Sequence, residues 1–379
     1  MPLTDVVIVG GGVIGLSTAY VLTREGVRTT VLDRRELGRE ASWAGAGMIA
    51  PTSEHVSVHP TVALRSWSAR LFSDWSAALL AETGIDNGYR RSGGVDVACN
   101  RDEAEALRAA AGRWRAEGVE FERLAYDDIR RVEPALSPSI EVAYYLPDRA
   151  QVRNPWHLRA LSAAIEGRDA TLTPHRAVKG FETSGSRVTA VVTDQGPLPC
   201  DCVVVAAGAW SAGVLAELAV TAPTPPVKGQ IVLLRPDRPV LKRVVERGSN
   251  YLVPRDDGRI LVGATEEHVG FDTNVTAQGV LGLLAEALQL CPGLSGATVE
   301  RCWAGLRPGS IDTRPYIGYA PGFENVIVAT GHKRAGLQLS PATAEVVGDL
   351  VLRRPPRLDL SPFEVGRQPG QTGDDSFRS

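Results

Sequence analysis

The sequence predicts an α/β protein of two domains, one built on a parallel sheet and the other an α+β domain built on a mostly antiparallel sheet. A strand–helix–strand pattern opens the chain, and the same kind of short, continuously apolar strand returns near the middle and the end. The length of 379 residues exceeds the usual size of one hydrophobic core. Because different material separates these strands, we expect the first domain to be interrupted twice by pieces of the second.

The first strand–helix–strand unit is the best-defined part of this pattern. Asp5–Gly10 is a continuous apolar run of the kind buried on both faces of a parallel sheet. Ile14–Glu25 then predicts a helix, and Val27–Leu32 predicts a second strand that ends before Asp33. The chain therefore opens with a Rossmann-like unit.

The remaining elements follow from hydrophobic spacing and turn residues. Asn154 is the expected N-cap of one helix, with Pro155 at its first position. A linker is expected at Ala222–Pro226. Helices are predicted at Pro60–Thr83, Asp102–Glu117, Trp156–Glu166, Ala277–Leu290 and Pro341–Leu352. Strands are predicted at Cys202–Ala207 and Asn325–Ala329 in the first sheet, and at Gln230–Leu234, Tyr251–Pro254 and Arg259–Val262 in the second.

Composition excludes several classes of function. The net charge is -3 with both signs interspersed, so we expect no nucleic-acid or anionic-membrane partner. Five cysteines without a CxxC pair indicate reduced thiols. The apolar run Val6–Leu22 is broken by glycines and lacks a basic leader, which predicts no stable membrane insertion and a cytoplasmic protein. His55 and His59 have metal-like spacing, but no third ligand is evident, so no metal is predicted.

The glycines after the first strand predict a dinucleotide site. Gly10, Gly12 and Gly15 fill the G-x-G-x-x-G pattern, and Val13 and Ile14 begin the helix whose N-terminus would face a pyrophosphate. Asp33, followed by Arg34, stands where a carboxylate accepts ribose hydroxyl groups. NAD and FAD share this fingerprint. The absence of a second fingerprint and the small residues of Gly38–Pro51 favour a large planar flavin ring, although a tightly packed loop has the same composition.

Several segments together carry a resemblance to a known family. They are GGGVIGLSTAYVL, ASWAGAGMIAP, DRAQVRNP, VVVAAGAWS, PVKGQ, YLVPRDDGRILVGAT, WAGLRPGSIDTRPYIG and GHKRAGLQLSPAT. In this order and spread to about residue 367, they resemble the D-amino-acid oxidase superfamily of flavoproteins, and most closely its glycine-oxidising members.

The resemblance implies a division of the chain and a mode of cofactor binding. An FAD-binding domain is expected from residues 1–86, 146–222 and 306–367, a substrate-binding domain from 87–145 and 223–305, and a flexible tail from 368–379. Relatives that bind FAD covalently use a histidine in the small-residue loop or a cysteine near Arg307. This sequence has Ala44 in that loop and no cysteine between Trp303 and Gly318, so we predict non-covalent FAD.

The resemblance also implies residue roles. Arg307 matches the arginine that holds the substrate carboxylate, Tyr251 the tyrosine that assists it, and Arg334 an arginine beside the flavin and the substrate. Ser42 is expected at the pyrophosphate, Met48 against the flavin, and the backbone of Val178 at the adenine. Gly336 and Leu337 are expected to stabilise the reduced flavin. The remaining expected cofactor contacts are Ala46, Gly47, Ala207, Gly208, Trp210 and Ala335.

The activity implied is FAD-dependent oxidative deamination of glycine, and of small amines or D-amino acids. Hydride transfer to flavin N5 would give the imine or glyoxylate, ammonia and, with oxygen as acceptor, hydrogen peroxide, in the service of thiamine thiazole biosynthesis. A D-amino-acid or sarcosine oxidase or dehydrogenase, a NAD-dependent dehydrogenase, and a non-catalytic flavin-binding subunit stay open as alternatives. Relatives are often homo-oligomers. Glu266 and Lys333 depart from the family pattern and put the polarity of the pocket in question, whereas Arg314 is interpreted as structural.

Overall fold

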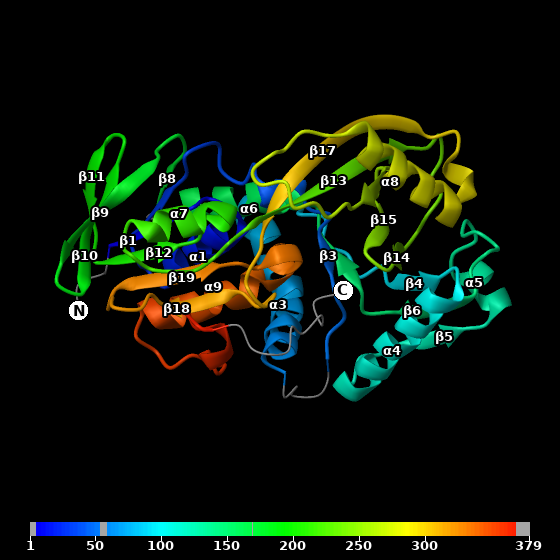
Figure 1. Cartoon of the computed structure of the whole chain (residues 1–379), viewed down its shortest axis with the longest axis horizontal. Helices are drawn as coiled ribbons and strands as arrows, with labels where there is room; N and C mark the ends of the chain where they lie inside the picture. Colours follow the sequence, from blue (N-terminus) through cyan, green and yellow to red (C-terminus); the bar gives the residue numbers. More distant parts are fainter. Residues whose placement is uncertain (1–4, 54–58, 169, 369–379) are drawn as a thin grey trace.

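Two sheets organise the computed structural model, which describes residues 5–53, 59–168 and 170–368 (Figure 1). One end of the long axis holds a six-stranded sheet with its helices, and the other end holds an eight-stranded sheet. The predicted tail, from residue 369 onward, lies outside the described residues.

The six-stranded sheet is parallel except at one edge, where β18 runs antiparallel to β19. Its strands come from the beginning, middle and end of the chain, which confirms the predicted return of the buried strand type. In sheet order they are β18 (Tyr316–Tyr319), β19 (Val326–Thr330), β12 (Cys202–Val205), β1 (Val6–Val9), β2 (Thr29–Leu32) and β8 (Ala170–Thr173).

Both faces of this sheet are covered, as the continuous apolar strands predict. Val6 and Ile8 of β1 pack among helices, whereas Val7 and Val9 point to the opposite layer. The helices are α1 (Val13–Arg24), α3 (Pro60–Thr83), α6 (Asn154–Glu166) and α9 (Gly336–Val351). The opposite layer holds β9 (Val178–Ser184), β10 (Arg187–Thr193), β11 (Gly196–Pro199) and α7 (Ser211–Ala216).

The eight-stranded sheet is antiparallel except for the pairing of β4 with β14, which confirms the mostly antiparallel second sheet. In sheet order its strands are β17 (Thr298–Pro308), β13 (Pro226–Arg235), β16 (Ile260–Gly263), β15 (Asn250–Pro254), β14 (Val244–Arg247), β4 (Gly94–Ala98), β6 (Val142–Leu146) and β5 (Glu122–Leu124). The associated helices are α4 (Arg101–Glu117), α5 (Tyr126–Val132) and α8 (Ala277–Leu290).

One face of this larger sheet packs on helices, and the other faces the first domain. Leu252 and Val262 join Leu283 of α8 in one core cluster. Tyr251 and Val253 belong to a separate cluster with Ala46 from the small-residue loop. The second face therefore forms a roof over that loop.

Short elements complete the connections between the two parts. α2 (Ala41–Ala44) and the β3–β7 pair lie in or beside the small-residue loop. The pair joins Met48–Ile49 to Ala150–Gln151. The 3-10 turns are Gly208–Trp210, Pro292–Leu294, Lys333–Ala335 and Ser361–Phe363. The proposed division into domains stays an interpretation, and β6 and β17 run across two of its boundaries.

Two local predictions were wrong, and a third was one residue too long. Asn154 is the first residue of α6 and Arg153 is its N-cap, because the Asn154 amide donates instead to the Ser42 carbonyl at 2.7 Å. The predicted linker is an irregular segment up to residue 225, and only its last residue, Pro226, already belongs to β13. The last helix begins at Gly336 rather than Pro341. A proline inside a helix leaves one carbonyl without its backbone donor, and here the Ser340 hydroxyl donates to the Leu337 carbonyl at 2.8 Å.

Candidate active site

An extended cavity lies between the first sheet and the roof sheet. All the residues predicted to contact cofactor or substrate line it, with the exception of Gly15. They are Gly10, Gly12, Val13, Ile14, Asp33, Arg34, Ser42, Ala46, Gly47, Met48, Val178, Ala207, Gly208, Trp210, Tyr251, Arg307, Arg334, Ala335, Gly336 and Leu337. The folded chain thus brings together segments that are more than 300 residues apart in sequence.

The turn between β1 and α1 needs its glycines for close backbone contact. Gly10 has φ +112°, and a Cβ there would lie 2.4 Å from the Ala206 carbonyl oxygen. A Cβ on Gly15 would lie 1.9 Å from the Gly10 carbonyl oxygen, so Gly15 supports the turn from behind instead of lining the cavity. Ser42 accepts a hydrogen bond from the Val13 N–H at 2.8 Å and ties the small-residue loop to the first turn of α1.

Asp33 and Arg34 form the next part of the wall, at the end of β2. The Asp33 carboxylate accepts hydrogen bonds from the N–H groups of Gly11 and Arg35, both at 2.9 Å. Burial raises the pKa of this carboxyl, although these two N–H groups oppose the rise. The Arg34 guanidinium lies 4.0 Å from the centre of the Trp210 ring. A cation and an aromatic ring therefore close this end of the cavity.

The small-residue loop approaches other backbone segments closely. A Cβ on Gly47, which has φ +74°, would lie 2.0 Å from the Val152 carbonyl oxygen. A Cβ on Gly305 of the roof would lie 2.5 Å from the Ala44 Cβ. The Trp303 indole donates to the Ala44 carbonyl at 3.0 Å. The small residues therefore let this loop pass between the Val152 segment and the roof sheet. The loop is tightly packed and also lines the cavity, so the two interpretations of its composition are compatible.

Arg307 lies on the cavity face of the roof, over a glycine. A Cβ on Gly229 of the neighbouring strand β13 would lie 2.3 Å from Nη2 of Arg307. Nη1 donates to the Thr265 carbonyl at 3.1 Å. Burial lowers the pKa of this guanidinium, while Tyr251 raises it. An arginine remains charged at neutral pH, so a fixed cation with further N–H donors faces the cavity.

The Tyr251 side chain on β15, like that of Arg307, lies over a glycine of the neighbouring strand. A Cβ on Gly263 of β16, its partner across the strands, would lie 2.5 Å from the tyrosine ring. Burial raises the pKa of the Tyr251 hydroxyl, although Arg307 and Arg334 act against the rise. The hydroxyl is therefore protonated at neutral pH and can donate a hydrogen bond.

Glu266, which departs from the family pattern, forms ion pairs with two neighbouring cations. Its carboxylate accepts a hydrogen bond from Arg334 Nε at 3.0 Å and lies 3.3 Å from Lys333 Nζ. Partial burial raises the pKa of Glu266, but the hydrogen bond and charge of Arg334 and the charge of Lys333 outweigh this and lower it to about 2. Glu266 itself does not line the cavity, and its negative charge is balanced by Lys333 and Arg334, which do.

The N-terminus of α9 faces the cavity next to this pair. Gly336 and Leu337 are its first two residues, and both line the cavity. The first N–H groups of a helix have no partner within the helix and present a partial positive charge. This arrangement suits a site where negative charge develops.

A buried charge cluster in the cavity wall was missed by the sequence reasoning. Arg149 forms ion pairs with Asp96 and Glu246, and all three side chains are buried. Burial and the neighbouring Glu246 raise the pKa of Asp96 to about 7, against the effect of Arg149. Arg149 and Glu246 line the cavity beyond Tyr251. The available signal was a single acid beside valines in each of two short strands, GVDVA and VVER.

His332 also lines the cavity and was not singled out by the sequence. Its imidazole Nε2 lies 3.2 Å from the Thr343 hydroxyl, and burial lowers its pKa to about 3. It is therefore neutral at physiological pH. Of the proposed metal-like pair, His55 lies outside the described residues and His59 precedes α3. Within the described ranges, no group of three His, Cys, Asp or Glu side chains is placed to hold a metal ion.

The cavity thus combines a glycine turn at the start of α1, a narrow small-residue loop and a charged roof, an arrangement that suits a flavin-dependent oxidoreductase. The chain belongs to the FAD dependent oxidoreductase family (DAO), whose model matches residues 5–350. FAD is accordingly its cofactor, and the NAD-dependent alternative is set aside. No helix within the described part of the chain has the length and apolarity needed to cross a membrane.

Individual relatives cover nearly the whole chain. A glycine oxidase of Pseudomonas putida is 40% identical over 360 residues, which is 95% of this chain and 97% of the relative. The bifunctional protein ThiO/ThiG of Synechocystis sp. is 35% identical over 92% of this chain, which covers 52% of that longer protein. The crystal structure of glycine oxidase from Geobacillus kaustophilus superposes with a TM-score of 0.92 at 34% identity, covering 97% of this chain and 99% of the other.

Proposed function

We propose that the protein oxidises glycine, and more slowly small amines or D-amino acids, to the imine and then to glyoxylate and ammonia. The observation that carries this proposal is the position of Arg307 and Tyr251, which face the cavity from the roof sheet. A planar guanidinium can hold a carboxylate by two parallel hydrogen bonds. The similarity to proteins named glycine oxidase supports the choice of substrate.

The residues that would hold FAD follow from the close contacts in the cavity. The Gly10–Gly15 turn and the N-terminus of α1 would bind the pyrophosphate, and Asp33 the ribose. Ala46, Gly47 and Met48 would lie along the ring system, with Val178 near the adenine. Bound FAD would supply a two-electron acceptor for the hydride of the substrate α-carbon, and oxygen would serve as the oxidant that gives hydrogen peroxide.

The chain's own contribution to the reaction is positioning and charge stabilisation. Arg307 holds the substrate carboxylate, Tyr251 donates a further hydrogen bond to it, and Arg334 closes the adjacent rim. Because the carboxylate is anchored at the roof, the α-carbon is directed toward the small-residue loop. The N–H groups at the start of α9 stabilise negative charge that develops on that side of the cavity.

Further parts of the proposal concern the cellular setting. The relative named ThiO/ThiG supports use of the product in thiamine thiazole biosynthesis. A cytoplasmic location, oxygen as the electron acceptor and a homo-oligomeric state are part of the same proposal.

The proposed substrate can be tested by mixing the purified yellow protein with amino acids in the absence of oxygen. Glycine is expected to bleach the visible flavin absorbance faster than sarcosine, D-alanine or D-proline, because the similar proteins are named glycine oxidase. Admission of oxygen should restore the colour and release peroxide. Failure of glycine to bleach the flavin would sink this proposal, and faster bleaching by another compound would reassign the substrate.

The mode of FAD attachment has its own test. Because Ala44 occupies the loop and no cysteine lies between Trp303 and Gly318, acid precipitation is expected to leave a colourless pellet and a yellow supernatant. The flavin is then measured by absorbance in both fractions. Yellow colour that stays with the pellet would mean a covalent bond.

A further inference from the structure

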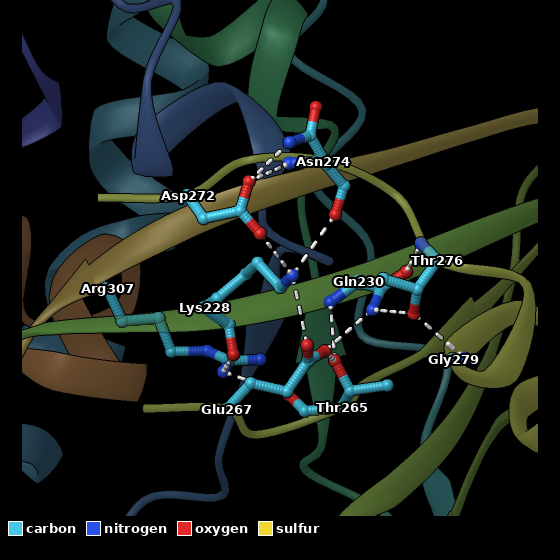
Figure 2. A network of polar contacts seen from close by, with 9 residues as sticks. All are labelled: Lys228, Gln230, Thr265, Glu267, Asp272, Asn274, Thr276, Gly279 and Arg307. Carbon is cyan, nitrogen blue, oxygen red and sulfur yellow. Dashed lines mark hydrogen bonds and ion pairs between the residues drawn. The ribbon is translucent and has the colours of Figure 1, made fainter. Parts of the chain in front are cut away.

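A cluster of polar side chains surrounds β13, the strand that pairs with the Arg307 strand β17 (Figure 2). It joins β13 to the connection between β16 and α8 and to the start of α8. We call it the Lys228 cluster, and its members are Lys228, Gln230, Thr265, Glu267, Asp272, Asn274 and Thr276. None of these residues lines the cavity.

Lys228 is the centre of this cluster. Its side chain is 1% exposed, and Nζ lies 3.0 Å from Glu267 Oε2, 3.1 Å from Asp272 Oδ2 and 3.1 Å from the Asn274 carbonyl oxygen. Burial lowers the pKa of Lys228, but the hydrogen bonds and charges of the two acids outweigh this and raise it. All three ammonium donors are used by one connecting segment, so Lys228 fixes residues 267–274 against β13.

Gln230 makes a second set of bonds to the same segment. Its Nε2 donates to Glu267 at 2.7 Å and to the Thr276 hydroxyl at 3.0 Å, and its Oε1 accepts from the Thr276 N–H at 2.9 Å. A Cβ on Gly279 would lie 2.4 Å from Gln230 Nε2, so α8 packs directly on this amide. The connecting segment is therefore held at both of its ends.

The cluster reaches Arg307 through Thr265. The Thr265 hydroxyl accepts from the Gln230 N–H at 2.9 Å and donates to Glu267, while its carbonyl accepts from Arg307 Nη1 at 3.1 Å. Lys228 pairs with Leu306 across the strands and Arg307 with Val227, so the side chains of Lys228 and Arg307 lie on opposite faces of the sheet. Lys228 thus cannot touch a substrate in the cavity.

The same connecting segment contacts two other walls of the cavity. Glu266 pairs with Arg334 and Lys333. Phe271 stacks on Trp210 with ring centres 5.4 Å apart. A shift of residues 264–276 would therefore move the acceptor of Arg307 and the partner of Arg334 together.

We propose that Lys228 is a positioning residue for the substrate carboxylate. It fixes the segment 264–276, whose Thr265 carbonyl orients the Arg307 guanidinium. This inference rests on the proposed function, in which Arg307 binds the carboxylate.

Lys228→Met keeps the length of the side chain and removes the ammonium. The expected result is a roughly 5- to 30-fold increase in KM for glycine and in the Kd of acetate. Acetate is a carboxylate without an amine to oxidise, and its binding next to the flavin is expected to perturb the flavin spectrum. The kcat and the flavin bound per chain should change much less. Lys242→Met, at an exposed position on the same domain, is the matched control.

A second set of variants separates positioning from general destabilisation. Asp272→Asn removes the charge of the more exposed of the two acids that contact Lys228. It should also raise the Kd of acetate, but by less than Lys228→Met does. In an Arg307→Lys background, Lys228→Met should add little to the Kd of acetate, because the group it positions is already altered.

The outcomes distinguish the two proposals. A lower thermal midpoint with an unchanged Kd of acetate in Lys228→Met would make Lys228 merely structural and overturn this inference. If Lys228→Met fails to retain FAD, an unchanged Kd of acetate in Asp272→Asn would likewise overturn the inference that Lys228 positions Arg307. An unchanged Kd in Arg307→Lys would instead overturn the proposed function of Arg307.

Discussion

Arg307→Lys is expected to raise the KM for glycine by roughly 10- to 100-fold while the protein keeps its FAD. Lysine retains the positive charge but presents a point donor in place of the planar fork, so the second parallel hydrogen bond to the carboxylate is lost. Lysine also cannot reach the Thr265 carbonyl in the geometry that Arg307 Nη1 uses. The effect should therefore appear in substrate affinity first.

The measurements for Arg307→Lys are steady-state rates on glycine, the Kd of acetate from the flavin spectrum, and flavin per chain. Arg314→Lys is the matched control in the same stretch of sequence. Its guanidinium Nε donates to Asp312 at 3.1 Å, away from the cavity, and a lysine can keep that ion pair. Loss of FAD from most of the Arg307→Lys protein, with a normal Kd of acetate in the fraction that keeps its flavin, would show that Arg307 is structural.

The cofactor half of the cavity could be predicted from sequence because its constraints are local. Gly10 and Gly15 contact each other across a single turn, and Asp33 comes directly after the next strand, β2. Such short-range requirements leave a recognisable spacing of residue types. The family resemblance then supplied Arg307, Tyr251 and Arg334, which the structure brings to the same cavity.

The roof of the cavity depends on strand register, which the sequence does not display. Gly229 matters because β13 pairs with β17 so that Arg307 lies over it, and Gly263 matters because it faces Tyr251. A shift of one residue in either pairing would turn these side chains to the other face of the sheet. No local pattern distinguishes these two glycines from the many others in the chain.

The buried cluster of Asp96, Arg149 and Glu246 also could not be predicted from the sequence, because it too depends on strand pairing. Asp96, Arg149 and Glu246 come from separate parts of the chain and meet only because β4 pairs in parallel with β14. Each residue alone is an ordinary charge in a chain with 41 basic and 44 acidic residues. The pairing partner decides whether such a charge is buried, and that partner is set by the tertiary fold.

Gly15→Ala is expected to remove FAD from the purified protein and to destabilise the first domain. The added Cβ would lie 1.9 Å from the Gly10 carbonyl oxygen and 3.2 Å from Cγ2 of Ile8, both on the turn and strand that begin the nucleotide site. A backbone carbonyl cannot yield as a flexible side chain can. Helix α1 must therefore move away from β1, at a cost of about 1 to 3 kcal/mol in overpacking, and its N-terminus moves away from the pyrophosphate.

The readouts for Gly15→Ala are flavin per chain and the thermal midpoint with and without added FAD. Gly282→Ala is the matched control, since Gly282 lies in α8 with no atom near its Cβ position, and alanine there should stabilise the helix by up to about 1 kcal/mol. Gly282→Ala should keep its flavin and its activity. Full flavin content in Gly15→Ala would contradict the requirement for close contact between α1 and the Gly10 carbonyl, which is the nearest neighbour of the added Cβ.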